Sequence, residues 1–235
     1  MIERFRLIAE VQTHLANLPS PRLGFNYLTV FRHEQIEENS QRWYHSAMEI
    51  KHLHKDAFDL ERGRAIGAFA ELECALCWIV AEAGHLDHKT ASVIFYANIS
   101  MQPRVEIASA LIEATYPDQL KIFWASACKI IDSLNKLRNK IVHWHGYPVY
   151  EGLDMTHTEN LLIHPVVYGD KTSQLSVHDM RQFTEKAQYT VKVLNVFRQC
   201  FDRSMGDLFQ SRAIDLFSKT ELRFPPPEVD PFSSR

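Results

Sequence analysis

The residues of this sequence whose types and spacing could do chemistry are Arg138, Asn139 and His143. Histidine titrates near neutral pH, so its imidazole can take up or release a proton under ordinary conditions. Arginine presents a fixed fork of donors that suits an oxyanion such as phosphate. Asparagine can hold an imidazole in one tautomer or bond the same oxyanion, and the sequence leaves both roles open.

The segment that carries these residues is predicted to be one long helix, opened by Pro117-Asp118 and running to about Trp144. Apolar residues recur along it at steps of four and three and form one stripe: Phe123, Ala127, Ile130, Leu134, Leu137, Ile141 and Trp144. At about 100° per residue, a set of polar residues falls on the opposite face: Asp132, Lys136, Asn139 and His143. Arg138 falls on the flank of the stripe.

A polar helix face is also what an ordinary solvated helix shows, so its position alone does not make His143 catalytic. Arg138 and His143 point about 140° apart on a regular helix. Only the long arginine side chain, or a distorted helix end, could bring both to one substrate. Lys136 and Lys140 flank the motif and either bind an anionic substrate or serve as solvated charges, and both interpretations stay open.

The segment LNKLRNKIVHWHG resembles the signature of HEPN domains. In that signature an arginine, a polar residue that is often asparagine, three further residues and a histidine stand near the end of a long helix. Arg138, Asn139 and His143 match all three positions. The resemblance covers roughly residues 56–205 and implies an all-α fold, an antiparallel helical bundle of HEPN type. Many HEPN domains are ribonucleases, among them toxins and phage-defence (abortive-infection) effectors, while others bind or scaffold without catalysis.

The resemblance implies a metal-independent endoribonuclease, a hydrolase that needs neither a metal nor a cofactor. His143 would take the proton from a ribose 2′-hydroxyl, Arg138 would bind the phosphate, and Lys136 and Lys140 would bring RNA in. The products would carry a 2′,3′-cyclic phosphate and a 5′-hydroxyl. The family is typically dimeric, so a homodimer would supply a second histidine as the acid, with His145 a weaker candidate. Its toxin members suggest an antitoxin or another regulatory protein as a further partner.

Two other functions stay open. One is a catalytically silent HEPN-like module that binds RNA, a nucleotide or a protein. The net charge of −3 favours it slightly, because a protein that grips long nucleic acid normally carries a basic face. The other is an unrelated helical scaffold in which the motif is a coincidence.

Three regions are expected along the chain: an N-terminal helical extension over 1–55, the HEPN-like domain over 56–218, and a disordered tail over 219–235. The tail, FPPPEVDPFSSR, has no hydrophobic period. Apolar periodicity predicts further helices over residues 2–17, 39–53, 56–84 and 103–115, and a final long helix from Ser176. Between the motif helix and that last helix, β-branched and aromatic runs bounded by turn residues predict a small β-hairpin-like excursion at about 146–172.

The composition is that of an ordinary soluble protein, with 46% apolar and 23% charged residues in 235. No segment approaches the roughly 18 apolar residues of a membrane span. The first residues mix charge into every turn, which is not typical of a secretory signal, so a cytoplasmic protein without membrane association is expected. Cys74 and Cys77 form a lone C-x-x-C in an apolar run, which indicates small core residues and not a zinc site.

Overall fold

The computed structural model describes residues 56–116, 118–151, 156–165, 174–204 and 206–233. The chain divides into two units, Met1–Lys51 and His52–Arg235, and the fold described below belongs to the second. The predicted extension over 1–55, with its helices at 2–17 and 39–53, lies outside the described residues.

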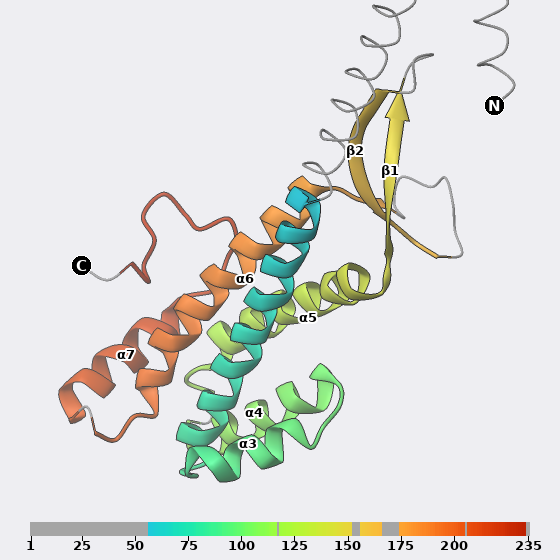
Figure 1. The fold of residues 1–235 in the computed structure, drawn as a ribbon. Coiled ribbons are helices and arrows are strands. Elements are labelled where there is room, and N and C mark those ends of the chain that lie inside the picture. Colours follow the sequence, from blue (N-terminus) through green and yellow to red (C-terminus); the bar gives the residue numbers. More distant parts are fainter. Residues whose placement is uncertain (1–55, 117, 152–155, 166–173, 205, 234–235) are drawn as a thin grey trace, which may run out of the picture. The chain divides into compact units, whose positions relative to one another are not determined.

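Helices make up most of the described chain, which confirms the mostly helical class (Figure 1). Residues 56–83 are helical, as the apolar periodicity predicts. The elements that follow are α3 (His88–Tyr96), α4 (Met101–Thr115), α5 (Lys121–His143), α6 (Val177–Phe197), a 3₁₀ turn (Arg198–Cys200) and α7 (Asp207–Lys219). The short helix α3 was not predicted; it begins at His88, and the side chain of the preceding Asp87 caps it by accepting a hydrogen bond from the amide of Thr90.

A small antiparallel sheet follows α5, in the region where the sequence predicts the hairpin-like excursion. Its strands are β1 (His145–Glu151), β2 (Thr156–Ile163) and β3 (Gln174–Leu175), in the order β1-β2-β3. The second strand begins four residues before the run NLLIHPVVYGDKT from which it was predicted, and residues 166–173 lie outside the description. Gly146 opposes Leu162, and a side chain at Gly146 would collide with the Phe58 ring, 2.9 Å from the position of its Cβ. One face of the hairpin therefore packs on the helix over 56–83.

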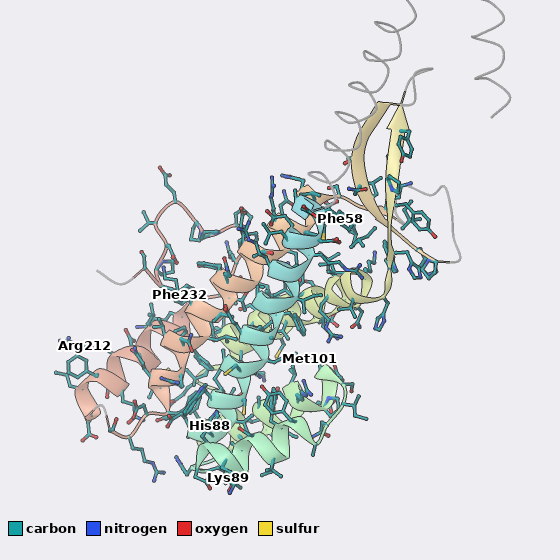
Figure 2. The ribbon with its side chains drawn as sticks, in the orientation of Figure 1. Phe58, His88, Lys89, Met101, Arg212 and Phe232 are labelled. Carbon is teal, nitrogen blue, oxygen red and sulfur yellow. The ribbon has the colours of Figure 1, made fainter. Side chains whose placement is uncertain are left out.

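Several aromatic side chains pack against one another beside the first half of α5, among them Phe232, which Figure 2 labels. The Phe123 ring centroid lies 4.5 Å from that of Phe197 and 4.6 Å from that of Phe217. Phe232, from the C-terminal segment, stacks on Phe217 with centroids 5.3 Å apart. All four rings are almost fully buried. Aromatic pairs at this spacing each add about 0.5–1.5 kcal/mol beyond the area that they bury.

In the C-terminal segment, which the sequence predicts to be a disordered tail, several described residues contact α5, α6 and α7, and Leu222 and Phe232 are buried. The amide of Leu222 donates to Ser126 Oγ at 2.8 Å, and the Tyr189 hydroxyl donates to Asp230 at 3.0 Å. Single apolar anchors between prolines leave no period in the sequence, so pattern analysis cannot distinguish such a segment from a disordered one.

Candidate functional site

The burial of α5 agrees with the face that the sequence assigns to it. Six of its side chains are buried: Phe123, Trp124, Ala127, Ile131, Leu134 and Ile141. Ile130 and Leu137, predicted members of the apolar stripe, are half-buried at its edge. The predicted polar face, comprising Asp132, Lys136, Asn139 and His143, is exposed throughout.

Arg138 lies on the flank of α5, where the helix over 56–83 passes. Its guanidinium carbon is 5.6 Å from the centroid of the Phe69 ring, within the range of a cation–π contact. Its Nη1 also donates a hydrogen bond to Asn139 Oδ1 at 3.2 Å. The side chain is half-buried. Phe69 and Asn139 thus orient the guanidinium, and its other N–H groups have no hydrogen-bond acceptor among the described residues, so they can bind an anion.

His143 is the last residue of α5 and is exposed. Within the described part of the chain, its imidazole has no hydrogen bond or ion pair with another residue. It lies one turn after Asn139, on the same side of the helix. Because α5 stays α-helical to His143, the turn of about 140° from Arg138 is kept. A single chain therefore brings Arg138 to Asn139 but does not bring Arg138 to His143.

Arg62, on the helix over 56–83, binds the C-terminal end of α5 and was not predicted from the sequence. Its Nε donates to the carbonyl of Ile141 at 2.9 Å, and its Nη2 donates to those of Val142 at 2.9 Å and Trp144 at 3.2 Å. The last carbonyls of a helix have no partner within it and carry partial negative charge, so a guanidinium is well matched to them. No pattern could have revealed a partner about 80 positions away in the chain.

The predicted substrate-binding lysines have different surroundings. Lys136 makes an exposed ion pair with Asp132, with Nζ and Oδ2 2.7 Å apart. Lys140 is half-buried and places its ammonium 5.0 Å from the centroid of the Trp144 ring. His145, the weaker acid candidate, is the exposed first residue of β1. Both lysines thus lie within two turns of His143, and Lys140 alone has no carboxylate partner among the described residues.

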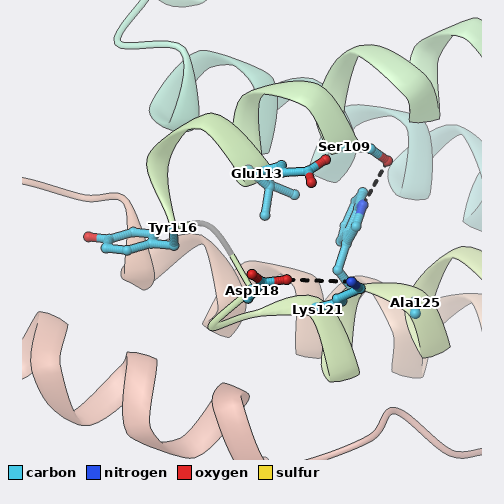
Figure 3. A pocket seen from close by; sticks show the side chains of 8 residues that line it. Ser109, Glu113, Tyr116, Asp118, Lys121 and Ala125 are labelled. Atoms are coloured by element: carbon cyan, nitrogen blue, oxygen red, sulfur yellow. Dashed lines mark hydrogen bonds and ion pairs between the residues drawn. The ribbon is translucent and has the colours of Figure 1, made fainter.

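A cavity of about 140 Å³ lies between α4 and the start of α5, at the other end of the motif helix (Figure 3). Two pairs of its polar groups interact. Trp124 Nε1 donates to Ser109 Oγ at 2.8 Å, and the Lys121 ammonium lies 3.4 Å from the Asp118 carboxylate. This cavity contains none of the predicted site residues.

The prediction that the C-x-x-C cysteines are small core residues is confirmed for Cys77, which is buried, and is wrong for Cys74, which is exposed. Of the other two cysteines, Cys200 is buried and Cys128 is half-buried. Burial raises the pKa of the Cys77 and Cys128 thiols, and raises that of Cys200 to about 12. The described residues contain no group of three or more His, Cys, Asp or Glu side chains placed to hold a metal ion.

Comparisons with models of protein families, with curated proteins and with solved structures match nothing to this chain. Among the described helices, none is long and apolar enough to cross a membrane. What the site can do follows from its side chains: an exposed imidazole, an oriented guanidinium with its amide partner, and nearby ammonium groups on one helix.

Proposed function

We propose that this chain is a metal-independent endoribonuclease of the HEPN type, with its site at the C-terminal end of α5. One observation carries the proposal. Arg138, Asn139 and His143 occupy the last turns of one regular helix, with Arg138 oriented by Phe69 and Asn139 and with His143 exposed. The arrangement offers a base and an oxyanion binder to a substrate that approaches from solvent.

The proposed reaction is attack by a ribose 2′-hydroxyl on the adjacent phosphorus. The neutral His143 imidazole takes the 2′-hydroxyl proton, the O2′–P bond forms and the P–O5′ bond breaks. The Arg138 guanidinium binds the non-bridging oxygens, whose negative charge grows during attack. An acid protonates the leaving O5′. The products are a 2′,3′-cyclic phosphate and a 5′-hydroxyl, with no change of oxidation state.

The acid is proposed to come from a second copy of the chain. One chain has one motif histidine, and about 140° of helix rotation separates it from Arg138. A twofold axis near the ends of two α5 helices would place the His143 of each copy near the Arg138 of the other. Light scattering at micromolar concentration is expected to give twice the mass of one chain. A monomer would leave His143 without its acid and would favour binding without catalysis.

The cellular role belongs to the same proposal. An endoribonuclease that binds RNA mainly through lysine and arginine reads little sequence. Such an activity suits a cytoplasmic toxin or phage-defence effector that an antitoxin or another regulatory protein restrains.

A second candidate is a catalytically silent HEPN-like module that binds RNA, a nucleotide or a protein. Two observations favour it: the His143 imidazole has no orienting partner among the described residues, and the chain carries a net charge of −3. In this alternative the same residues bind phosphate and no bond is broken.

The test is incubation of the purified full-length protein with mixed RNAs, with and without EDTA. The proposal predicts cleavage that EDTA does not stop, with cyclic phosphate at the new 3′ ends. His143→Ala should lose this cleavage. His178→Ala is its matched control, because His178 is an exposed histidine on another helix whose one hydrogen bond among the described residues is with Gln182. Binding of RNA without any cleavage would favour the silent module. Cleavage that stops with EDTA would contradict the proposed chemistry.

A further inference from the structure

Three lysines of α5 lie on the same face as His143. Lys129, Lys136 and Lys140 follow one another at steps of seven and four, and His143 comes three residues later. At about 100° per residue, all four fall within an arc of about 60°. From the first to the last, this face extends about 21 Å along the helix. Lys129 and Lys136 are exposed, and Lys140 is half-buried.

A fourth lysine joins this face from α6. Lys186 Nζ donates a hydrogen bond to Ser133 Oγ at 2.8 Å, and Ser133 lies on α5 between Lys129 and Lys136. Lys186 lines a groove of about 550 Å³ between α5 and α6, with Leu137 and Phe224 among its apolar walls. Burial lowers the pKa of the Lys186 ammonium. A partly desolvated cation without a counterion costs stability, and a bound anion would offset that cost.

Among the described residues, the nearby carboxylates leave most of these lysines without an ion pair. Asp132 pairs with Lys136, and Asp179 accepts hydrogen bonds from the amide and hydroxyl of Ser176 as a helix cap. Glu185 lines the same groove. Across the described residues, no carboxylate lies within ion-pair distance of Lys129, Lys140 or Lys186. An otherwise acidic chain thus concentrates cations on one path that leads to His143.

We propose that this lysine row, defined as Lys129, Lys136, Lys140 and Lys186, binds the phosphates of a single strand of RNA that runs along α5 toward His143. The inference rests on the proposed ribonuclease function for what happens at His143. A single row of lysines along one helix face can follow the phosphate backbone of one RNA strand, whereas a duplex would present two such backbones. Lysine ammonium groups act as point charges and read phosphate without reading bases. The row therefore predicts binding that depends strongly on salt and weakly on sequence.

The test is binding of a fluorescent single strand of 2′-O-methyl RNA, which has no free 2′-hydroxyl and cannot be cleaved by the proposed route. Anisotropy titrations at several salt concentrations give the slope of log affinity against log salt. For single strands, each lost phosphate contact reduces this slope by about 0.7. Lys129→Ala and Lys186→Met are each expected to reduce it by about that amount. The double variant is expected to lose about twice as much and to weaken affinity at low salt by about tenfold.

Two lysines serve as matched controls because each pairs with a carboxylate and lies off the row. Lys121, on α5, pairs with Asp118, and Lys192, on α6, pairs with Asp230. Lys121→Ala and Lys192→Ala should leave the slope unchanged. Lys186→Met should not lower the unfolding midpoint, because it removes an uncompensated ammonium and keeps the aliphatic stem. Weaker binding without lower stability separates a lost contact from a folding defect.

Several outcomes would overturn the lysine row. The first is a salt slope that is unchanged in the row variants or falls equally in the control variants. The second is that the protein does not bind the single strand or binds a duplex more tightly. The third is that polyglutamate competes for the protein as well as the single strand of RNA does. If the protein binds the uncleavable strand through the lysine row but does not cleave ordinary RNA, the proposed binding role of the row stands and the proposed ribonuclease function is wrong. The two proposals can therefore fail separately.

Discussion

The first half of α5 packs among buried aromatic rings, whereas its last turns are exposed on one side and contact the helix over 56–83 on the other. Around Phe123, the rings of Phe197, Phe217 and Phe232 have centroids within 6 Å. Trp124, the next residue, hydrogen-bonds Ser109. At the other end, Arg62 binds three carbonyls of the final turn, and Phe69 lies under Arg138. Asn139 and His143 face solvent there.

This difference indicates how one helix can serve both stability and chemistry. Buried rings contribute stability in proportion to the apolar area that they remove from water. Exposed polar side chains contribute little stability, so their identity is free to serve another purpose. If the ring-enclosed half anchors the helix and the solvent-facing half carries the reaction, substitutions in the two halves should separate stability from activity. Five predictions test that separation.

The largest effect is expected from His143→Ala. Loss of a general base lowers a cleavage rate by about 10²–10⁴-fold. The unfolding midpoint should stay within error, because the imidazole is exposed and has no partner among the described residues. Single-turnover cleavage and thermal denaturation, run beside His178→Ala, check both halves of the statement. A variant that cleaves like the wild type would remove His143 from the reaction.

Phe123→Ala tests the ring-enclosed half. Truncation of a fully buried phenylalanine costs about 3–5 kcal/mol of unfolding free energy. Phe123 contacts three rings from α6, α7 and the C-terminal segment, so we expect the upper part of that range. Denaturant unfolding followed by circular dichroism measures it. A loss below about 1 kcal/mol would mean that this half is not the anchor.

Arg138→Lys keeps the charge and removes the planar fork. We expect cleavage to fall by about 10²-fold, because removing one aligned donor to a developing oxyanion has an effect of about that size. The contact with Phe69 and the hydrogen bond to Asn139 should weaken as well, with little change in the unfolding midpoint. Rate measurements at saturating RNA decide the matter. A lysine variant with full activity would show that Arg138 supplies only general positive charge.

Arg62→Ala should loosen the end of α5 without unfolding the core. A charged hydrogen bond contributes about 1.5–3 kcal/mol, and three carbonyls lose their donor together. Amide hydrogen exchange should quicken at residues 143–146 and stay unchanged near Phe123. Arg64→Ala is a control on the same helix, because the one ion pair of Arg64 among the described residues is with Glu61. Equal acceleration along all of α5 would contradict the division of the helix into two halves.

The smallest effect concerns the cysteines. Cys74 is exposed and should react first with an alkylating reagent at pH 8. Burial raises the pKa of Cys128, so fewer thiolates form there at that pH, and a higher pH should speed its reaction. Cys200, with a pKa of about 12, should stay unreactive until the protein unfolds. Mass spectrometry of alkylated peptides gives the order, and early labelling of Cys200 would show that the ring-enclosed region opens.

The features that could be predicted from the sequence are those that the spacing of apolar residues along a helix determines. The apolar repeat of three and four defined the buried and exposed faces of α5, and with them the exposure of Asn139 and His143. Periodicity says nothing of contacts between distant segments. The Arg62 contacts, the Phe69 ring under Arg138 and the hydrogen bond from Lys186 to Ser133 all join different helices. Phe232 was missed for the same reason, since one ring docked between helices leaves no repeat.

The most direct measurement uses a DNA strand that contains a single ribonucleotide, incubated with the full-length protein in EDTA. The proposed route predicts cleavage only after that ribonucleotide, with a 2′,3′-cyclic phosphate on one product and a 5′-hydroxyl on the other. His143→Ala should cleave the strand about 10²–10⁴-fold more slowly, and the all-DNA strand should resist the wild type. Cleavage of the all-DNA strand, or equal cleavage by His143→Ala, would contradict 2′-hydroxyl attack at the end of α5.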